Sequence, residues 1–438
     1  MKSHNKEHIK AYNFTPVLKN YEWGSISAIQ SIIEREDLRG TPLAELWMGS
    51  HKNGDCMVSL SIEKEMKLSE FIKTNEDDIL GKTVNKKYNG ELPFLFKILS
   101  AEKPLSIQVH PSKNEAEKGF TKEEKAIDIS ADNRTYKDRN HKLELLYTLT
   151  DFSLMKGFRD HKDIYLNLSK FSPLFATRAE KNFKKEIRAI TIKELFGYLL
   201  LMDKNHLHDV IDETIGVCKK TGLLHSVRND VFVESHNFAR KDTTNGSLQN
   251  DSQKIISDTI NYFYSVFKYD SGVLSPLFLN ILKLKPQSAI FIPEGELHSY
   301  ISGTGFEIMA NSDNVLRGGL TKKYIDVKGL LEIGNFKKSS FSKDNTFPKI
   351  ERNAEKYITR AKEFIFSVIS LDKGNYKYEK SGKNIELFFY IGKGCRVSFP
   401  NEKRSYNFKN GSSFLIPACA FPYVIDGDGT LYMTSVDI

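Results

Sequence analysis

The segment Ser288-Ala-Ile-Phe-Ile-Pro-Glu-Gly-Glu-Leu-His-Ser-Tyr-Ile-Ser-Gly-Thr-Gly305 is echoed near the end of the chain by Ser412-Ser-Phe-Leu-Ile-Pro-Ala-Cys-Ala-Phe-Pro-Tyr-Val-Ile-Asp-Gly-Asp-Gly429. Aligning the two prolines also aligns both glycine pairs without a gap. Chance is one explanation, because short β segments resemble one another. The other is a repeat of two similar jelly-roll barrels in tandem. In that case only the first barrel keeps a candidate metal ligand, since His298 aligns with Pro422.

The pattern along the chain predicts a mainly β protein of tandem barrels with an α-helical insertion. Strand-like runs precede residue 159, and apolar residues at helical spacing follow until residue 268. We therefore expect a catalytic barrel from residues 1–159 and 269–335, a helical insertion domain at 160–268, and a degenerate C-terminal barrel at 336–438. The insertion is expected to cap the entrance to the site. Within it, His236 to Lys254 is polar and predicts an exposed loop.

Composition excludes several classes of protein. The 438 residues carry a formal charge of +8, but their charges are interspersed, so we expect no nucleic-acid partner. Apolar runs are short, which predicts no membrane span. The polar first residues do not resemble a secretory signal. Four cysteines without paired spacing argue against a cysteine-built zinc site and favour the cytoplasm.

Candidate metal ligands occur in three segments. Pro104-Leu-Ser-Ile-Gln-Val-His-Pro111 alternates as a strand does, so Ser106, Gln108 and His110 share one face. Polar groups in a barrel interior need partners, and a metal ion would provide one, although a solvent-facing strand explains the same pattern. Taken alone, Glu144 before an apolar strand favours a surface carboxylate, and His298 after a turn favours a hydrogen-bonded core histidine.

Together these segments and several others resemble the type I mannose-6-phosphate isomerases (phosphomannose isomerases) of the cupin superfamily. The shared motifs, in the family's order, are Asn20-Tyr-Glu-Trp-Gly24, Ala44-Glu-Leu-Trp-Met-Gly-Ser-His51, Leu92-Pro-Phe-Leu-Phe-Lys-Ile-Leu99, Leu105-Ser-Ile-Gln-Val-His-Pro111, Tyr136-Lys-Asp-Arg-Asn-His-Lys-Leu-Glu144, Gly295-Glu-Leu-His-Ser-Tyr300 and Ser312-Asp-Asn-Val-Leu-Arg-Gly-Gly-Leu-Thr-Lys-Lys323. The chain departs from the family beside the site, at Leu143, Leu145, Gly318, Gly319 and Lys322. These changes affect loop geometry, not the matched polar residues.

The resemblance implies an enzyme of mannose metabolism that interconverts mannose 6-phosphate and fructose 6-phosphate. It implies one Zn²⁺ per chain, with Gln108, His110, Glu144 and His298 as ligands. It further implies that Arg317 is catalytic and stabilises an anionic enediol-type intermediate. It also implies that Ser106 and Lys97 contact the phosphate and that Lys142 lies near the substrate. Lys323 and Trp23 are further candidate substrate-binding residues.

Several alternatives remain open at this level. The proton-transferring group is to be found among His141, Lys142, Glu294 and Glu307, with the pKa of histidine the best suited. Lys97 faces either the barrel interior or solvent. Arg317 is either the catalytic arginine or one half of a surface ion pair with Asp313. Trp23 either walls the site or packs in the core.

Two other classes of protein compete with the isomerase. One is a cupin oxygenase that uses iron, and the other is a sugar-binding bicupin without catalytic activity. The only partner we expect is a small sugar phosphate, with the chain a monomer or a weak homo-oligomer.

Overall fold

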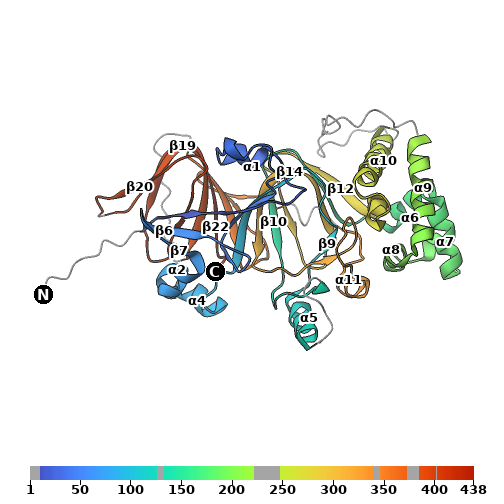
Figure 1. Ribbon diagram of the computed structural model, residues 1–438, viewed down its shortest axis with the longest axis horizontal. Coiled ribbons are helices and arrows are strands. Elements are labelled where there is room, and N and C mark those ends of the chain that lie inside the picture. Colours follow the sequence, from blue (N-terminus) through green and yellow to red (C-terminus); the bar gives the residue numbers. More distant parts are fainter. Residues whose placement is uncertain (1–9, 126–132, 221–246, 340–345, 372–383, 401) are drawn as a thin grey trace.

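The computed structural model describes residues 10–125, 133–220, 247–339, 346–371, 384–400 and 402–438. Two ten-stranded antiparallel sheets form its framework. One sheet is central and the other is terminal. A group of helices lies beyond one end of the central sheet, and the terminal sheet lies at the opposite end of the molecule (Figure 1). Antiparallel β structure is therefore the scaffold, with helices more prominent than a mainly β fold would have.

The central sheet contains the segments with the candidate ligands. Its strands run in the order β12-β11-β14-β8-β3-β2, and β9, β10, β13 and β15 attach to this path through β14 and its neighbours. Their bounds are β2 Val17–Lys19, β3 Glu45–Met48, β8 Phe94–Ala101, β9 Gln108–Val109, β10 Glu144–Thr148, β11 Phe152–Phe158, β12 Leu279–Leu284, β13 Ala289–Ile292, β14 His298–Ala310 and β15 Leu316–Arg317. β4 Ser50–His51 and β5 Gly54–Asp55 form a separate hairpin.

The terminal sheet runs in the order β16-β17-β18-β22-β19-β21-β1-β6-β7, with β20 paired to β19. Its strands are β1 Tyr12–Thr15, β6 Met57–Ser61, β7 Lys64–Lys67, β16 Lys349–Glu351, β17 Ala354–Tyr357, β18 Ile365–Ser370, β19 Glu386–Ser398, β20 Ser405–Phe408, β21 Ser413–Ile416 and β22 Val424–Ser435. β1, β6 and β7 come from the first 70 residues. The predicted division at residues 1–159 therefore does not follow the sheets, because β1 hydrogen-bonds to β21.

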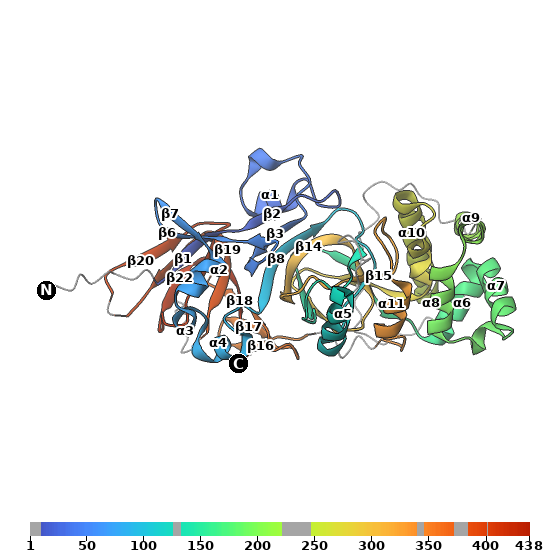
Figure 2. The same cartoon turned by 60° about the horizontal axis from the view of Figure 1, so that its bottom comes forward.

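Helices fall into two groups (Figures 1 and 2). Those beyond the central sheet are α6 His161–Phe171, α7 Pro173–Phe183, α8 Ile192–Leu201, α9 Lys204–Lys220 and α10 Ser247–Phe267. The remaining helices flank the two sheets, and α11 also contacts α8. They are α1 Ala28–Ile32, α2 Leu68–Thr74, α3 Glu76–Leu80, α4 Lys82–Tyr88, α5 Lys113–Lys125 and α11 Val327–Ile333. Short 3₁₀ turns lie at Glu36–Leu38, Ile187–Ala189 and Ser271–Leu277. No helix in the described ranges combines the length and apolarity needed to cross a bilayer.

Two predictions about helices need correction. The first 150 residues were expected to be mainly strands and turns, but α1 to α5 lie there. Most of these helices are too short to show a clear apolar period, and α3 depends on a cap in which Asn75 accepts a hydrogen bond from the Asp78 amide. Part of the predicted loop, 236–246, lies outside the described residues. Its remainder, from Ser247, is the first turns of α10.

The core explains how the helices and sheets fit together. Ile107 and Val109 are fully buried and pack with residues of α6 to α10. Between the two sheets, Phe306 of β14 packs against Phe366 of β18, with ring centroids 6.0 Å apart. The helices therefore share one apolar core with the residues that alternate with Gln108 and His110. That the insertion caps the entrance to the site stays a prediction.

Truncating Ile107 tests this packing. Ile107→Ala should lower the free energy of unfolding by about 2–5 kcal/mol, because it removes a buried side chain and leaves a cavity. Denaturant unfolding measures the change. Ile62→Ala is the matched control, since Ile62 is fully exposed and its truncation should cost almost nothing. Equal effects of the two changes would contradict the packing described here.

Candidate metal centre

Two buried histidines are held in the same way. His110 lies one residue beyond β9, and its Nδ1 is 2.8 Å from the carbonyl oxygen of Asn314. His298 opens β14, and its Nδ1 is 3.0 Å from the carbonyl oxygen of Glu296. A carbonyl oxygen only accepts, so each Nδ1 carries the proton and donates it. In a neutral imidazole held in this way, Nε2 keeps the lone pair that binds a metal.

Glu144, the first residue of β10, faces both histidines. Its Oε1 lies 3.3 Å from His110 Nε2 and its Oε2 lies 3.2 Å from His298 Nε2. The three side chains are almost wholly buried, and atoms of all three lie within 4.8 Å of one another. This is a buried cluster of two imidazoles and one carboxylate.

The charge states of this cluster favour a cation. Burial lowers the pKa of His110 to about 4, with Lys142 adding to the effect, so the imidazole is neutral near pH 7. Burial alone would raise the pKa of Glu144, but the Lys142 ammonium, 2.9 Å from Oε1, and the two histidines hold it well below its usual range. A neutral His110 imidazole therefore faces an ionised carboxylate.

The donor set fits a zinc ion. Among the described residues, neither His110 Nε2 nor Glu144 Oε2 has a hydrogen-bond partner, and an unpaired buried acceptor is costly. A tetrahedral zinc with bonds of about 2.0–2.1 Å separates its ligand atoms by about 3.3 Å. One oxygen of Glu144 lies at about that distance from His110 Nε2, and its other oxygen lies at about that distance from His298 Nε2. The same residues therefore fit the metal that the sequence predicts.

Strand pairing puts Gln108 and Arg317 beside this cluster. Gln108 of β9 is the cross-strand partner of His298 on one side and of Arg317 in β15 on the other. Directly opposed residues of antiparallel strands project from the same face. Gln108, His298 and Arg317 therefore form one row across three strands. β9 itself is shorter than expected, since only Gln108 and Val109 are in strand conformation.

Arg317 is a partly buried cation. Burial lowers its pKa, and no charged neighbour contributes to the shift. The competing interpretation was an ion pair with Asp313, but Asp313 pairs instead with His51, 3.2 Å away, and accepts a hydrogen bond from Asn53. The guanidinium is thus not committed to that carboxylate.

Lys97 is buried in a network of its own. Its ammonium lies 2.9 Å from Glu307 Oε2 and 3.5 Å from Glu45 Oε1. Burial would lower the pKa of Lys97, but these two carboxylates raise it above its usual value. Tyr300 donates a hydrogen bond to the other oxygen of Glu307. Lys97 thus faces inward, and carboxylates of the protein already match its charge.

His141 lies three residues before Glu144 in the sequence and belongs, with Glu294, to a second network. His141 Nδ1 is 3.0 Å from Glu294, and its Nε2 is 3.1 Å from Glu363. Glu294 also accepts a hydrogen bond from Arg360. Burial would lower the pKa of His141, but the two carboxylates raise it from 6.5 to about 9. Near neutrality His141 is therefore protonated.

Three further predicted residues are Ser106, Lys323 and Trp23. Ser106 is partly buried beside β9, and Lys323 is exposed on the loop after β15. Trp23 stacks on Tyr21 and packs in the apolar cluster that includes Tyr300, whose ring is 6.1 Å from that of His298.

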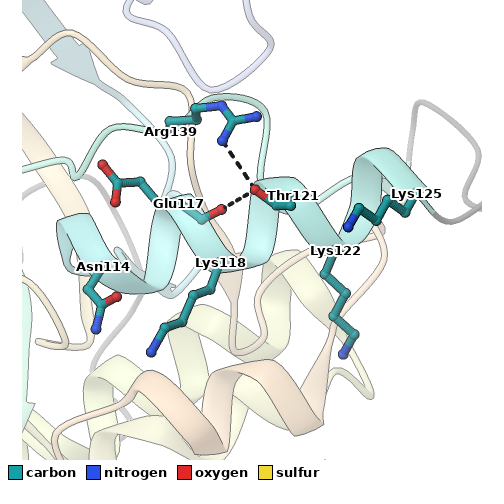
Figure 3. Close-up of a pocket in the computed structure, with 7 residues that line it drawn as sticks. All are labelled: Asn114, Glu117, Lys118, Thr121, Lys122, Lys125 and Arg139. Carbon is teal, nitrogen blue, oxygen red and sulfur yellow. Dashed lines mark hydrogen bonds between the residues drawn. The ribbon is translucent and has the colours of Figure 1, made fainter.

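A surface hollow along α5 contains none of the predicted site residues. It is lined by Asn114, Glu117, Lys118, Thr121, Lys122, Lys125 and Arg139. Figure 3 shows Arg139 donating to the Thr121 hydroxyl, which in turn donates to the carbonyl of Glu117. These are polar and charged side chains of α5, together with Arg139. The candidate chemistry lies in the buried cluster of His110, Glu144 and His298.

Five residues near the site were missed as site residues by the sequence analysis: Glu45, Tyr300, Asn314, Arg360 and Glu363. Tyr300 follows His298 by two positions in one strand, so alternation was a usable signal. Arg360 and Glu363 lie between β17 and β18, and nothing in their local sequence points to His141 or Glu294.

The fold and the site define a metal-site protein built on antiparallel sheets, and known proteins identify its family. A family model for the phosphomannose isomerase type I catalytic domain matches residues 12–161. The mannose-6-phosphate isomerases of Escherichia coli (strain K12) and Shigella flexneri are each 33% identical over 417 residues, which cover 94% of this chain and 96% of theirs. The human mannose-6-phosphate isomerase is 30% identical over 361 residues, covering 80% of this chain and 78% of its own.

Solved structures agree with the sequence relatives. A zinc-bound mannose 6-phosphate isomerase has a TM-score of 0.80 and 29% identity, covering 98% of this chain and all of its own. A variant of phosphomannose isomerase from Salmonella typhimurium has a TM-score of 0.82 with the same identity and coverage. The chain therefore belongs to the type I mannose-6-phosphate isomerases, a family of enzymes.

The raised pKa of His141 predicts how stability depends on pH. The folded state binds this proton more tightly than the unfolded state, where the pKa is 6.5. The stabilisation is therefore complete below about pH 6.5 and is lost as the pH rises through about 9. His141→Asn should remove this dependence, which is on the order of 1–3 kcal/mol. Urea unfolding at a series of pH values measures it.

The control for that experiment is His206→Asn, which removes an exposed imidazole paired with Asp203. It should keep the pH dependence of the unaltered chain. If the free energy of unfolding depends on pH in the same way for the unaltered chain and for His141→Asn, the His141 network is not the source of that dependence.

Proposed function

We propose that this chain interconverts mannose 6-phosphate and fructose 6-phosphate with one zinc ion held by Gln108, His110, Glu144 and His298. The observation that carries the proposal is the buried cluster of His110, Glu144 and His298. The imidazoles of His110 and His298 and the ionised Glu144 carboxylate converge there. Membership of the isomerase family and the zinc in a related structure support the same choice of metal.

The reaction moves a proton between C1 and C2 of the sugar phosphate through an enediol-type intermediate. A bound zinc ion would supply Lewis-acid polarisation of the substrate oxygens. With Glu144 as the only anionic ligand, the site keeps a net positive charge that favours an enediolate. Burial of the three ligands excludes water, which strengthens these interactions.

Arg317 is proposed to stabilise the developing anion. Its place in the row with Gln108 and His298 directs it to the same face. It is always charged and offers a planar set of donors. Because Asp313 is paired elsewhere, the guanidinium is available to an anionic substrate.

The roles of the segment before Glu144 follow from its contacts. Lys142 lies against the Glu144 carboxylate, where its ammonium would contact the substrate side of the site. His141 is protonated and held by Glu294 and Glu363, so it acts as a proton donor or a positioning group and not as a base at neutral pH. Glu294 is occupied by His141 and Arg360 in this arrangement.

Phosphate binding is assigned to residues around the same row. Ser106 precedes Gln108 by two positions, which supports a shared face. Lys97 and Lys323 remain predicted contacts of the substrate, and Lys97 would have to share its ammonium with Glu307 and Glu45. Trp23 is proposed as a wall of the pocket, through its cluster with Tyr300.

We also propose that the two sheets are tandem cupin barrels. The repeated segments of the sequence form matching units, β13–turn–β14 and β21–turn–β22, with Pro293 and Pro417 at the turns. Residues 160–268 are the helical insertion between parts 1–159 and 269–335 of the catalytic barrel, while 336–438 form the second barrel together with β1, β6 and β7. Aromatic side chains such as Phe388 and Phe414 fill the second barrel.

The proposed setting is the cytoplasm, with a sugar phosphate as the only partner and a monomer or weak homo-oligomer as the assembly. All four cysteines are free thiols, which agrees with a reducing compartment. We propose no nucleic-acid or membrane partner.

Metal removal is the direct test of function. Treatment with a chelator should abolish fructose 6-phosphate formation from mannose 6-phosphate in a coupled assay, and added zinc should restore it. Glu144→Gln, which removes the only anionic ligand, should not be restored at the same zinc concentration. Full activity after verified metal removal would refute the proposal, and oxygen consumption dependent on iron would favour the oxygenase.

Arg317 can be tested separately. Arg317→Ala should lower kcat about 10²–10³-fold, the usual loss when a group that stabilises a developing anion is removed. Arg317→Lys should recover only part of this, because lysine keeps the charge but not the planar donor set. Arg188→Ala, at an exposed ion pair with Glu186, is the control. Unchanged kinetics for Arg317→Ala would point to a binding protein or another catalytic cation.

A further inference from the structure

The side chain of Asn314 ties together two segments on either side of the metal centre. It is wholly buried on the loop before β15. Its Oδ1 accepts hydrogen bonds from the backbone amides of Lys137 and Asp138, at 2.6 and 3.1 Å. Its Nδ2 donates to the carbonyl oxygens of Asp138 and Asn140, both at 2.8 Å. One amide group therefore fixes the backbone from residue 137 to residue 140.

The fixed backbone leads directly into the site. Lys142 and Glu144 follow Asn140 by two and four residues. The same loop is also held from the other side, because Asp138 accepts hydrogen bonds from the Ser312 hydroxyl and the Asp313 amide. Residues 137–140 and 312–314 thus form one hydrogen-bonded unit.

The main chain of Asn314 reaches the metal cluster as well. Its carbonyl oxygen accepts the hydrogen bond from His110 Nδ1, which sets the tautomer and ring orientation of that histidine. The equivalent carbonyl for His298 belongs to Glu296, two residues away on the same segment. His110 depends instead on a residue 204 positions distant in the sequence, so its orientation depends on tertiary contacts.

We propose that Asn314 is a positioning residue that couples the orientation of His110 to the placement of Glu144. Its side chain sets the loop that leads to Glu144, and its carbonyl sets His110. Only an amide offers an acceptor and two donor hydrogens on one planar group. A carboxylate at this position would lose the donors and face Asp138 Oδ1, which lies 3.2 Å from Nδ2. This inference rests on the proposed metal function of the cluster.

The test compares Asn314→Asp and Asn314→Ala with the unaltered chain. Affinity for Zn²⁺ and Co²⁺ is measured by competition with a chelating dye, and the visible spectrum of the Co²⁺ form reports the ligand geometry. Both variants should bind metal about 10–100-fold more weakly and should show an altered Co²⁺ spectrum. Asn311→Ala is the matched control. Asn311 lies three residues before Asn314 on the same loop, and its side chain donates one hydrogen bond of 3.3 Å, to the carbonyl oxygen of Leu92.

A merely structural role predicts a different result. It would lower the thermal stability of the metal-free protein but leave the affinity and spectrum of the folded protein unchanged, and that outcome would overturn the inference. If Asn314→Ala does not fold, Asp138→Asn disturbs the same unit without altering Asn314, and it should also weaken metal binding and shift the spectrum. An unaltered chain that binds neither ion would overturn the proposed function too, whereas normal binding by every variant overturns this inference alone.

Discussion

The convergence of His110, Glu144 and His298 is the constraint on which the rest of the structure depends. A buried acceptor without a hydrogen-bond partner is costly, and His110 Nε2 and Glu144 Oε2 are two such atoms among the described residues. Lys142 offsets part of the carboxylate charge, but it leaves His110 Nε2 unmatched. The protein tolerates this arrangement because strands and loops hold all three side chains in place. A bound divalent ion would interact with these groups and so offset the free energy that their burial costs.

Strand alternation separates this chemistry from the packing that supports it. In the segment around β9, Gln108 and His110 are candidate ligands, while Ile107 and Val109 belong to the apolar core that includes residues of α6 to α10. The helical region thus stabilises the strand that supplies two proposed ligands. Among the described residues, none of these helices supplies a member of the His110, Glu144 and His298 group. Along this short segment, alternate side chains therefore contribute to the apolar core and to the candidate metal centre.

The terminal sheet also takes part, although its interior holds aromatic side chains. Glu363 and Arg360, which lie between its strands β17 and β18, complete the network around His141 and Glu294. This network fixes the start of the segment that delivers Glu144. On the far side, the unit formed by residues 137–140 and 312–314 fixes the same segment. Elements distant in sequence therefore hold the carboxylate from two directions.

The sequence by itself determined the order of the motifs and placed Ser106, Gln108 and His110 on one face, because alternation is a local property. The full set of candidate ligands, with Glu144 and His298, came from the resemblance of these motifs to a known family. It did not reveal that β1, β6 and β7 join the terminal sheet, or that Lys97 is matched by Glu307 and Glu45. It also left the partner of Asp313 undecided, which proved to be His51. Only the tertiary structure decided these points, since each depends on a hydrogen bond or ion pair between residues far apart along the chain. Such contacts leave no periodic trace in the sequence.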